Sequence, residues 1–76
     1  MKKRENKKLL RALGKRIREL RKKQNISQAQ LGFECGVHGE YIGRIERGLQ
    51  SPTISTLESV AKALDVKLKD LVDFER

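Results

Sequence analysis

The stretch that most constrains the fold is QAQLGFECGVHGEYIGRIER, at residues 28–47. Its apolar residues recur at helical spacing and are Leu31, Cys35, Val37, Ile42 and Ile45. Gly36 stands where that spacing changes phase. Apolar residues at steps of three and four indicate a helix, and glycine adopts a positive φ cheaply. The stretch therefore predicts two short helices, at about 27–35 and 38–47, joined by a tight corner.

An amphipathic helix is expected before this stretch. Its apolar stripe consists of Leu10, Leu13, Ile17 and Leu20. We place this helix at about 7–24, with Asn25 as a left-handed stop. Residues 1–6 are expected to form a flexible basic arm. Ser27, with Gln30 three residues further on, is the predicted N-cap of the next helix.

Two more helices are expected after it. A turn at Ser51-Pro52 leads to Thr53, the predicted N-cap of a helix at about 53–64. Its apolar stripe consists of Ile54, Leu57, Val60, Ala61 and Leu64. A short fifth helix is expected at about 68–74; residues 66–69 also alternate like a strand, but no other segment could pair with them. The chain is therefore predicted to be all-α, with a single domain at 7–76.

The composition excludes several classes of function. One cysteine and one histidine among 76 residues allow no internal disulfide and no Cys/His metal cluster. They also leave no set of nucleophile, base and orienting group, so neither an enzyme nor a bound cofactor is expected. No apolar run approaches the roughly 20 residues of a membrane span, and no signal peptide is recognisable. A cytoplasmic protein is expected.

The positive charge lies almost entirely in the first third of the chain. Residues 1–25 contain twelve Lys/Arg and two acids, a net charge of +10, whereas residues 26–76 have a net charge of −2. Such a segment can be a solvated face or tail, but it also attracts polyanions through counterion release. A membrane surface is a weaker alternative because no Trp or Phe accompanies the basic residues. Nucleic acid is therefore the expected partner.

Three motifs at residues 26–71 carry a family resemblance. They are S-Q-x-x-L-(x)4-G-V, Y-I-x-R-I-E-R-G and S-P-T-I-(x)2-L-(x)3-A-K-A-L. In this order and spacing they resemble the Cro/lambda-repressor type helix-turn-helix family, also called the xenobiotic response element family. Its small members include controller proteins of restriction–modification operons and phage repressors. The resemblance implies a compact five-helix lambda-repressor-like domain whose helix 38–47 enters the major groove.

The resemblance also implies DNA-contacting residues. The positions expected at base edges are Gly39, Glu40, Gly43 and Arg44. Those expected at phosphates are Gln28, His38, Tyr41, Arg47 and Thr53. Arg44 matches the O6 and N7 acceptors of guanine, while Glu40 would either accept from cytosine N4 or orient Arg44. The two glycines would either let the backbone approach the DNA or reflect neutral drift on an exposed face.

Further residues are assigned structural roles. The resemblance implies an ion pair between Arg21 and Glu46 that joins the first and third helices. Gly32 is expected where the two helices of the motif touch, and Cys35 is expected to be a buried small hydrophobe. Phe33 and Leu49 lie off the core stripes. The resemblance also implies a twofold dimer, whose interface is expected at residues of the last helix and the segment before it, some of which must also fill the core: Val66, Leu68, Leu71, Val72 and Phe74.

These observations predict a stand-alone regulator of transcription from a bacterium, phage or mobile element. It would bind double-stranded DNA in a sequence-specific manner as a homodimer, and no small-molecule effector is expected. Two alternatives stay open. An antitoxin-like protein would bind another protein through its C-terminal segment and would co-purify with it. An RNA-binding protein with the same fold would keep its affinity for RNA in the presence of competing duplex DNA.

Overall fold

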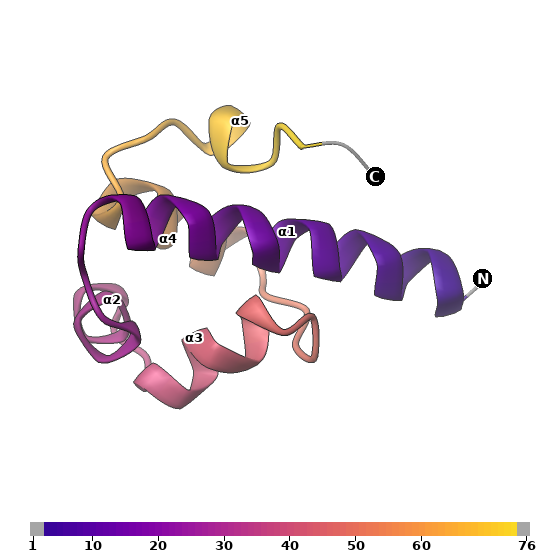
Figure 1. The fold of residues 1–76 in the computed structure, drawn as a ribbon, viewed down its shortest axis with the longest axis horizontal. Helices are drawn as coiled ribbons and strands as arrows, with labels where there is room; N and C mark the ends of the chain where they lie inside the picture. The colour runs from indigo at the N-terminus through magenta and orange to yellow at the C-terminus, as the bar shows by residue number, and fades with distance from the viewer. Residues whose placement is uncertain (1–2, 75–76) are drawn as a thin grey trace.

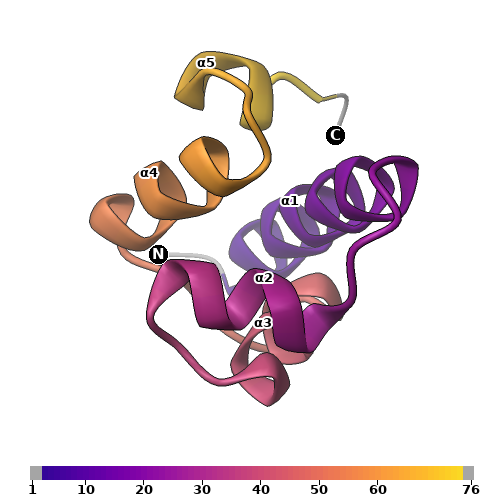
Figure 2. The ribbon, with the colours of Figure 1, turned by 90° about the vertical axis from the view of Figure 1, so that its left-hand side faces the viewer.

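The computed structural model describes residues 3–74, with side chains from residue 6 onward. Its helices are α1 (Lys3–Lys23), α2 (Gln28–Cys35), α3 (Gly39–Glu46), α4 (Ile54–Ala63) and α5 (Leu68–Leu71). Helix α1 runs along the molecule with α2 and α3 on one side and α5 on the other (Figure 1). Seen from one end, α2 crosses in front of α3, while α4 and α5 lie together above them (Figure 2). The predicted all-α fold is confirmed.

Two helix boundaries differ from the sequence prediction by more than one residue. Helix α1 begins at Lys3, so the predicted start at residue 7 is wrong; residues 1 and 2 of the predicted basic arm lie outside the described part. The first turns of α1 contain Lys, Arg and Glu, which are good helix formers, and no glycine or proline interrupts them. Helix α5 ends at Leu71 and not at residue 74.

Arg16 of α1 binds the last turn of α5. Its Nε and Nη2 donate to the carbonyl oxygen of Asp70 at 3.1 and 3.0 Å. The same oxygen also accepts from the backbone amide of Asp73 at 3.4 Å. The turn that follows α1 contacts the end of α4, because Gln24 Nε2 donates to the carbonyl oxygen of Leu64, the residue after that helix.

The caps follow the local sequence as predicted. Ser27 precedes α2 in an extended conformation, and its side chain accepts from the Gln30 amide at 3.0 Å. Gly36 ends α2 with φ of 75°, and the Val37 amide donates to the Gly32 carbonyl at 2.8 Å. Asn25 takes the predicted left-handed conformation, with φ of 59°. The sharp corner between α2 and α3 therefore has a local cause.

The core is formed by one side of each helix. Its buried apolar residues are Leu13, Ile17, Leu31, Ile42, Ile45, Leu57, Val60, Ala61, Leu64 and Leu71. Ile54, expected on the core stripe of α4, is 66% exposed. It is the first residue of α4, ahead of the stretch whose buried residues face the core. Among the described residues, no helix has both the length and the apolar character needed to cross a membrane.

Candidate nucleic-acid interface

Helices α2 and α3 form a tight helix-turn-helix. A Cβ atom added at Gly32 would lie 2.7 Å from the carbonyl oxygen of Val37 and 2.9 Å from the amide nitrogen of Gly39. Both distances are shorter than van der Waals contact, so the backbone of the corner rests directly on α2. The expectation that a small residue is needed at position 32 is confirmed.

One side of α3 is exposed. Glu40, Arg44 and Arg47, at steps of four and three, form an exposed stripe, whereas Ile42 and Ile45 are buried on the opposite side. Arg44 Nε donates to Gln50 Oε1 at 3.4 Å. No ion pair joins Arg44 to Glu40 within the described residues, so Glu40 does not orient Arg44 here. Sequence reasoning missed Gln50, because it lies in the loop that follows the helix.

The two glycines of α3 lie elsewhere, and their expected place at base edges is corrected. Gly43 is buried, and a Cβ atom added there would lie 3.2 Å from Gln28 Oε1. At Gly39 an added Cβ atom would lie 2.9 Å from Ala29 Cα. Both glycines therefore face α2, where they allow close packing, whereas Glu40 and Arg44 lie on the exposed side of α3.

The residues expected at phosphates differ in availability. His38 is exposed and precedes α3 without a side-chain capping bond. The hydroxyl of Thr53 caps α4 by accepting from the Thr56 amide at 3.1 Å. Tyr41 is half-buried against the core, and Arg47 is exposed. Thr53 is thus occupied as a helix cap, whereas His38 and Arg47 are available at the surface.

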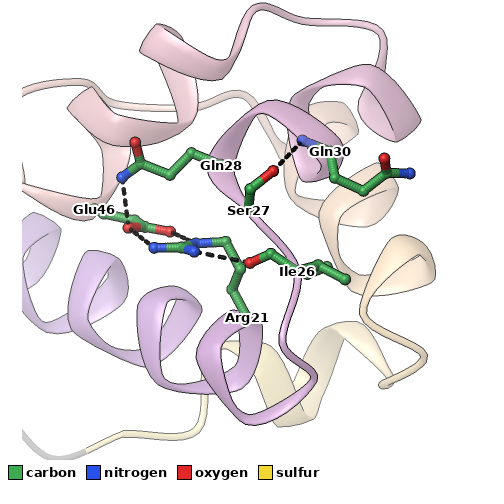
Figure 3. Close-up of polar contacts among 6 residues, drawn as sticks. All are labelled: Arg21, Ile26, Ser27, Gln28, Gln30 and Glu46. Carbon is green, nitrogen blue, oxygen red and sulfur yellow. Dashed lines mark hydrogen bonds and ion pairs between the residues drawn. The ribbon is translucent and has the colours of Figure 1, made fainter.

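The expected ion pair joins the motif to α1. Arg21 Nε lies 2.7 Å from Glu46 Oε2, and Arg21 Nη2 lies 3.0 Å from Oε1 (Figure 3). Arg21 Nη1 donates to the Ile26 carbonyl at 2.9 Å, and Gln28 Nε2 donates to Glu46 Oε1 at 3.0 Å. The side chains of Arg21 and Glu46 are only 10% and 3% exposed. One network therefore connects α1, the α1–α2 turn, α2 and α3.

The electrostatics of this network favour the charged pair. The hydrogen bond with Glu46 raises the pKa of Arg21; partial burial opposes that shift, and the negative charge of Glu46 adds to it. The Gln28 amide is engaged by Glu46, so Gln28 must leave this bond, or share it, to reach a phosphate. In this structure Gln28 thus stabilises the Arg21–Glu46 ion pair.

Cys35 is a half-buried residue of α2. Burial, and then the charge of Glu34, raise the pKa of its thiol. A raised pKa keeps the group protonated at neutral pH, which agrees with the expected role as a small hydrophobe. The part of the chain that the structure describes contains no group of three His, Cys, Asp or Glu residues that could hold a metal ion.

Sequence reasoning also missed Gly14, where α1 crosses α3. A Cβ atom added at Gly14 would lie 2.3 Å from the Ile45 carbonyl oxygen and 2.6 Å from that of Glu46. The available signal was a glycine in the middle of a long amphipathic helix, which costs about 1 kcal/mol relative to alanine and so points to a packing reason.

The predicted dimer residues are only partly on the surface. Leu71 is fully buried in the core, so its expected place in an interface is wrong. Val66, Leu68 and Phe74 are half-buried against the core, and Val72 is 42% exposed. Phe33 and Leu49 are exposed, as expected.

Comparisons with known proteins agree with this architecture. A helix-turn-helix family model matches residues 17–71. The control protein C.BamHI of Bacillus amyloliquefaciens is 45% identical over 62 residues, covering 80% of this chain and 76% of the relative. Several longer regulators are also similar, and the chain spans about half of their length.

Solved structures show the same arrangement of helices. The restriction-modification controller protein C.AhdI from Aeromonas hydrophila has a TM-score of 0.79 at 35% identity, over 82% of this chain and 90% of that one. The P22 c2 repressor protein, solved in complex with a synthetic operator, has a TM-score of 0.76 at 36% identity, over 83% and 96%.

The fold and the exposed side of α3 define a lambda-repressor-like helix-turn-helix domain. The chain belongs to the helix-turn-helix family, as the motifs at residues 26–71 predicted. The relatives it matches are transcriptional regulators and controller proteins rather than enzymes.

Proposed function

We propose that this protein regulates transcription by binding specific sites on double-stranded DNA as a dimer, with α3 in the major groove. The observation that carries the proposal is the exposed stripe of Glu40, Arg44 and Arg47 on a helix held rigidly from behind. A major groove admits one α-helix, and side chains on its outer face reach the base edges. Similarity to a repressor solved with its operator supports this placement.

The residues divide between base and backbone contacts. Arg44 presents two parallel donors to guanine, and Glu40 accepts from cytosine N4. His38, Tyr41, Arg47 and Thr53 flank the groove and contact phosphates, with Gln28 joining them when its amide turns from Glu46. Similarity to a restriction-modification controller protein favours the control of such an operon, which the neighbouring genes would test.

Arg44→Ala is expected to weaken binding to the preferred site by about 1–3 kcal/mol and to relax selection at one base pair. Sites selected from random duplexes, followed by titrations at fixed salt, measure both effects. Lys62→Ala is the matched control, because it removes the same charge from an exposed position near the end of α4. Equal losses on selected and random DNA would make Arg44 a phosphate contact.

The proposed dimer uses the exposed surface around α5, formed by Val66, Leu68, Val72 and Phe74. Twofold symmetry then places the two α3 helices about one turn of DNA apart. Val72→Asp is expected to yield a monomer, because a carboxylate would lose its water on association. Sedimentation at micromolar concentrations tests this. Phe33→Asp is the control, because it also replaces an exposed apolar residue with a carboxylate, but on α2. A monomeric wild type would contradict the proposed dimer.

A further inference from the structure

The place where α1, α2 and α3 meet is hollowed into a pocket of about 270 Å³. Its lining residues are Arg18, Arg21, Gln28, Glu46 and Arg47. Arg21, Gln28 and Glu46 form its inner wall, where they bind one another (Figure 3). We propose that Arg18 and Arg47 hold a phosphodiester of the DNA backbone in this pocket, so that α1 belongs to the binding surface. This inference rests on the proposed function.

The charges of the pocket favour an anion. Three arginines face one glutamate, which gives a net charge of +2. Both oxygens of Glu46 accept from Arg21, and one also accepts from Gln28, so this acid is neutralised. The side chains of Arg18 and Arg47 are exposed, and neither side chain has an ion pair or hydrogen bond with another residue in the described range. Two guanidinium groups are therefore left to bind an outside ligand.

The position of the pocket identifies that ligand as backbone phosphate. Arg47 continues the exposed stripe of α3, three residues after Arg44, so the pocket borders the surface that faces the groove. Arg18 lies four residues after Gly14 and three before Arg21, and both of these contact α3. Arg18 is thus on the α3 side of its helix. Guanidinium groups bind phosphate oxygens through paired, charge-assisted hydrogen bonds.

Arg18→Gln is the variant that tests the pocket. It is expected to reduce the slope of log K against log salt by about 1 and to weaken binding about five- to tenfold at 0.1 M salt. The loss is expected to be equal on selected and random duplexes, because a phosphate carries no base identity. The melting temperature is expected to stay at the wild-type value, because Arg18 is exposed and unpaired in the described part.

Lys15→Gln is the matched control. It removes the same charge one turn away, from a side chain that lines a hollow with Asp73 and Phe74 next to the C-terminal segment. If both variants give the same slope, Arg18 acts only through net charge, and the proposed phosphate site is overturned. A lower melting temperature with an unchanged slope would make Arg18 a structural partner of Glu46, which also overturns it.

The outcomes separate this inference from the proposed function. If Arg18→Gln selects sites normally and keeps the wild-type slope of log K against log salt, only the proposed phosphate site is overturned. A wild type that shows no preference among duplexes and no salt-dependent binding overturns both. Titration with inorganic phosphate, followed by the NMR signals of the arginine Nε–H groups, tests the other source of the same chemistry. Saturation by free phosphate that duplex DNA does not displace would make the pocket a small-anion site and overturn the assignment to DNA.

Discussion

The Glu46→Gln variant is expected to lose about 3–5 kcal/mol of unfolding free energy. The change keeps the shape of the side chain but removes the negative charge from a site that is 3% exposed. In the wild type, Arg21 Nε and Nη2 donate to the two carboxylate oxygens of Glu46. A glutamine at this position offers one oxygen acceptor and one amino group in place of those two oxygens. A buried guanidinium would therefore face a donor and lose its counter-charge.

Urea and thermal unfolding measure this loss. In a domain of this size, the expected change lowers the melting temperature by about 12 °C or more. Glu58→Gln is the matched control, because it makes the same substitution at an exposed position of α4. The control is expected to stay within about 0.5 kcal/mol of the wild type. A Glu46→Gln melting curve that superposes on that of the wild type would show that the pair contributes nothing.

A double variant distinguishes a stranded charge from a general loss of packing. Arg21→Met combined with Glu46→Leu removes both charges and keeps similar volumes. Replacing a whole buried pair is often neutral or stabilising, so the double variant is expected to recover most of the loss. Recovery should be incomplete, since the Ile26 carbonyl and the Gln28 amide would each lose a partner. A double variant less stable than Glu46→Gln would contradict this explanation.

The predictions that succeeded from the sequence depend on local chemistry. Ser27, Gly36 and Asn25 act through the backbone of their own or the next turn, so short motifs identify them without knowledge of the fold. The Arg21–Glu46 pair spans 25 residues, and only the family resemblance predicted it. Helix propensity and caps alone contain no information about which side chains of two distant helices meet.

The predictions that failed depend on how helices are rotated and spaced. The local sequence around Gly43 is typical of an exposed helix position, but the side chain of Gln28 of α2 covers Gly43. Helix α5 ends at Leu71, and Arg16 of α1, 54 residues before Asp70, binds the Asp70 carbonyl at this end. Arg44 is oriented by Gln50, a loop residue with no periodic pattern. In each case the site contacts a residue outside its own helix, and the local sequence does not identify that residue.

Gly14→Ala is the second variant expected to have a large effect. It is expected to destabilise the protein, although helix propensity alone predicts stabilisation. Alanine in the middle of α1 should stabilise an isolated helix by about 1 kcal/mol. In the folded protein, however, the new methyl group would lie 2.3 and 2.6 Å from two carbonyl oxygens of α3. These are backbone atoms, so the whole of α3 must move away from α1. We expect a net loss of about 2 kcal/mol or more.

Gly43→Ala provides the matched control for this prediction. It makes the same change in a helix interior, but the nearest atoms, at 3.2 Å or more, belong to the movable side chain of Gln28. A small shift of that amide relieves the contact, so Gly43→Ala is expected to change stability by less than about 1 kcal/mol. Urea unfolding of both variants compares a methyl group placed against rigid backbone atoms with one placed against a flexible side chain. A Gly14→Ala variant as stable as the wild type would mean that α1 and α3 are further apart in solution, and Arg21 and Glu46 would then also lie beyond hydrogen-bond distance.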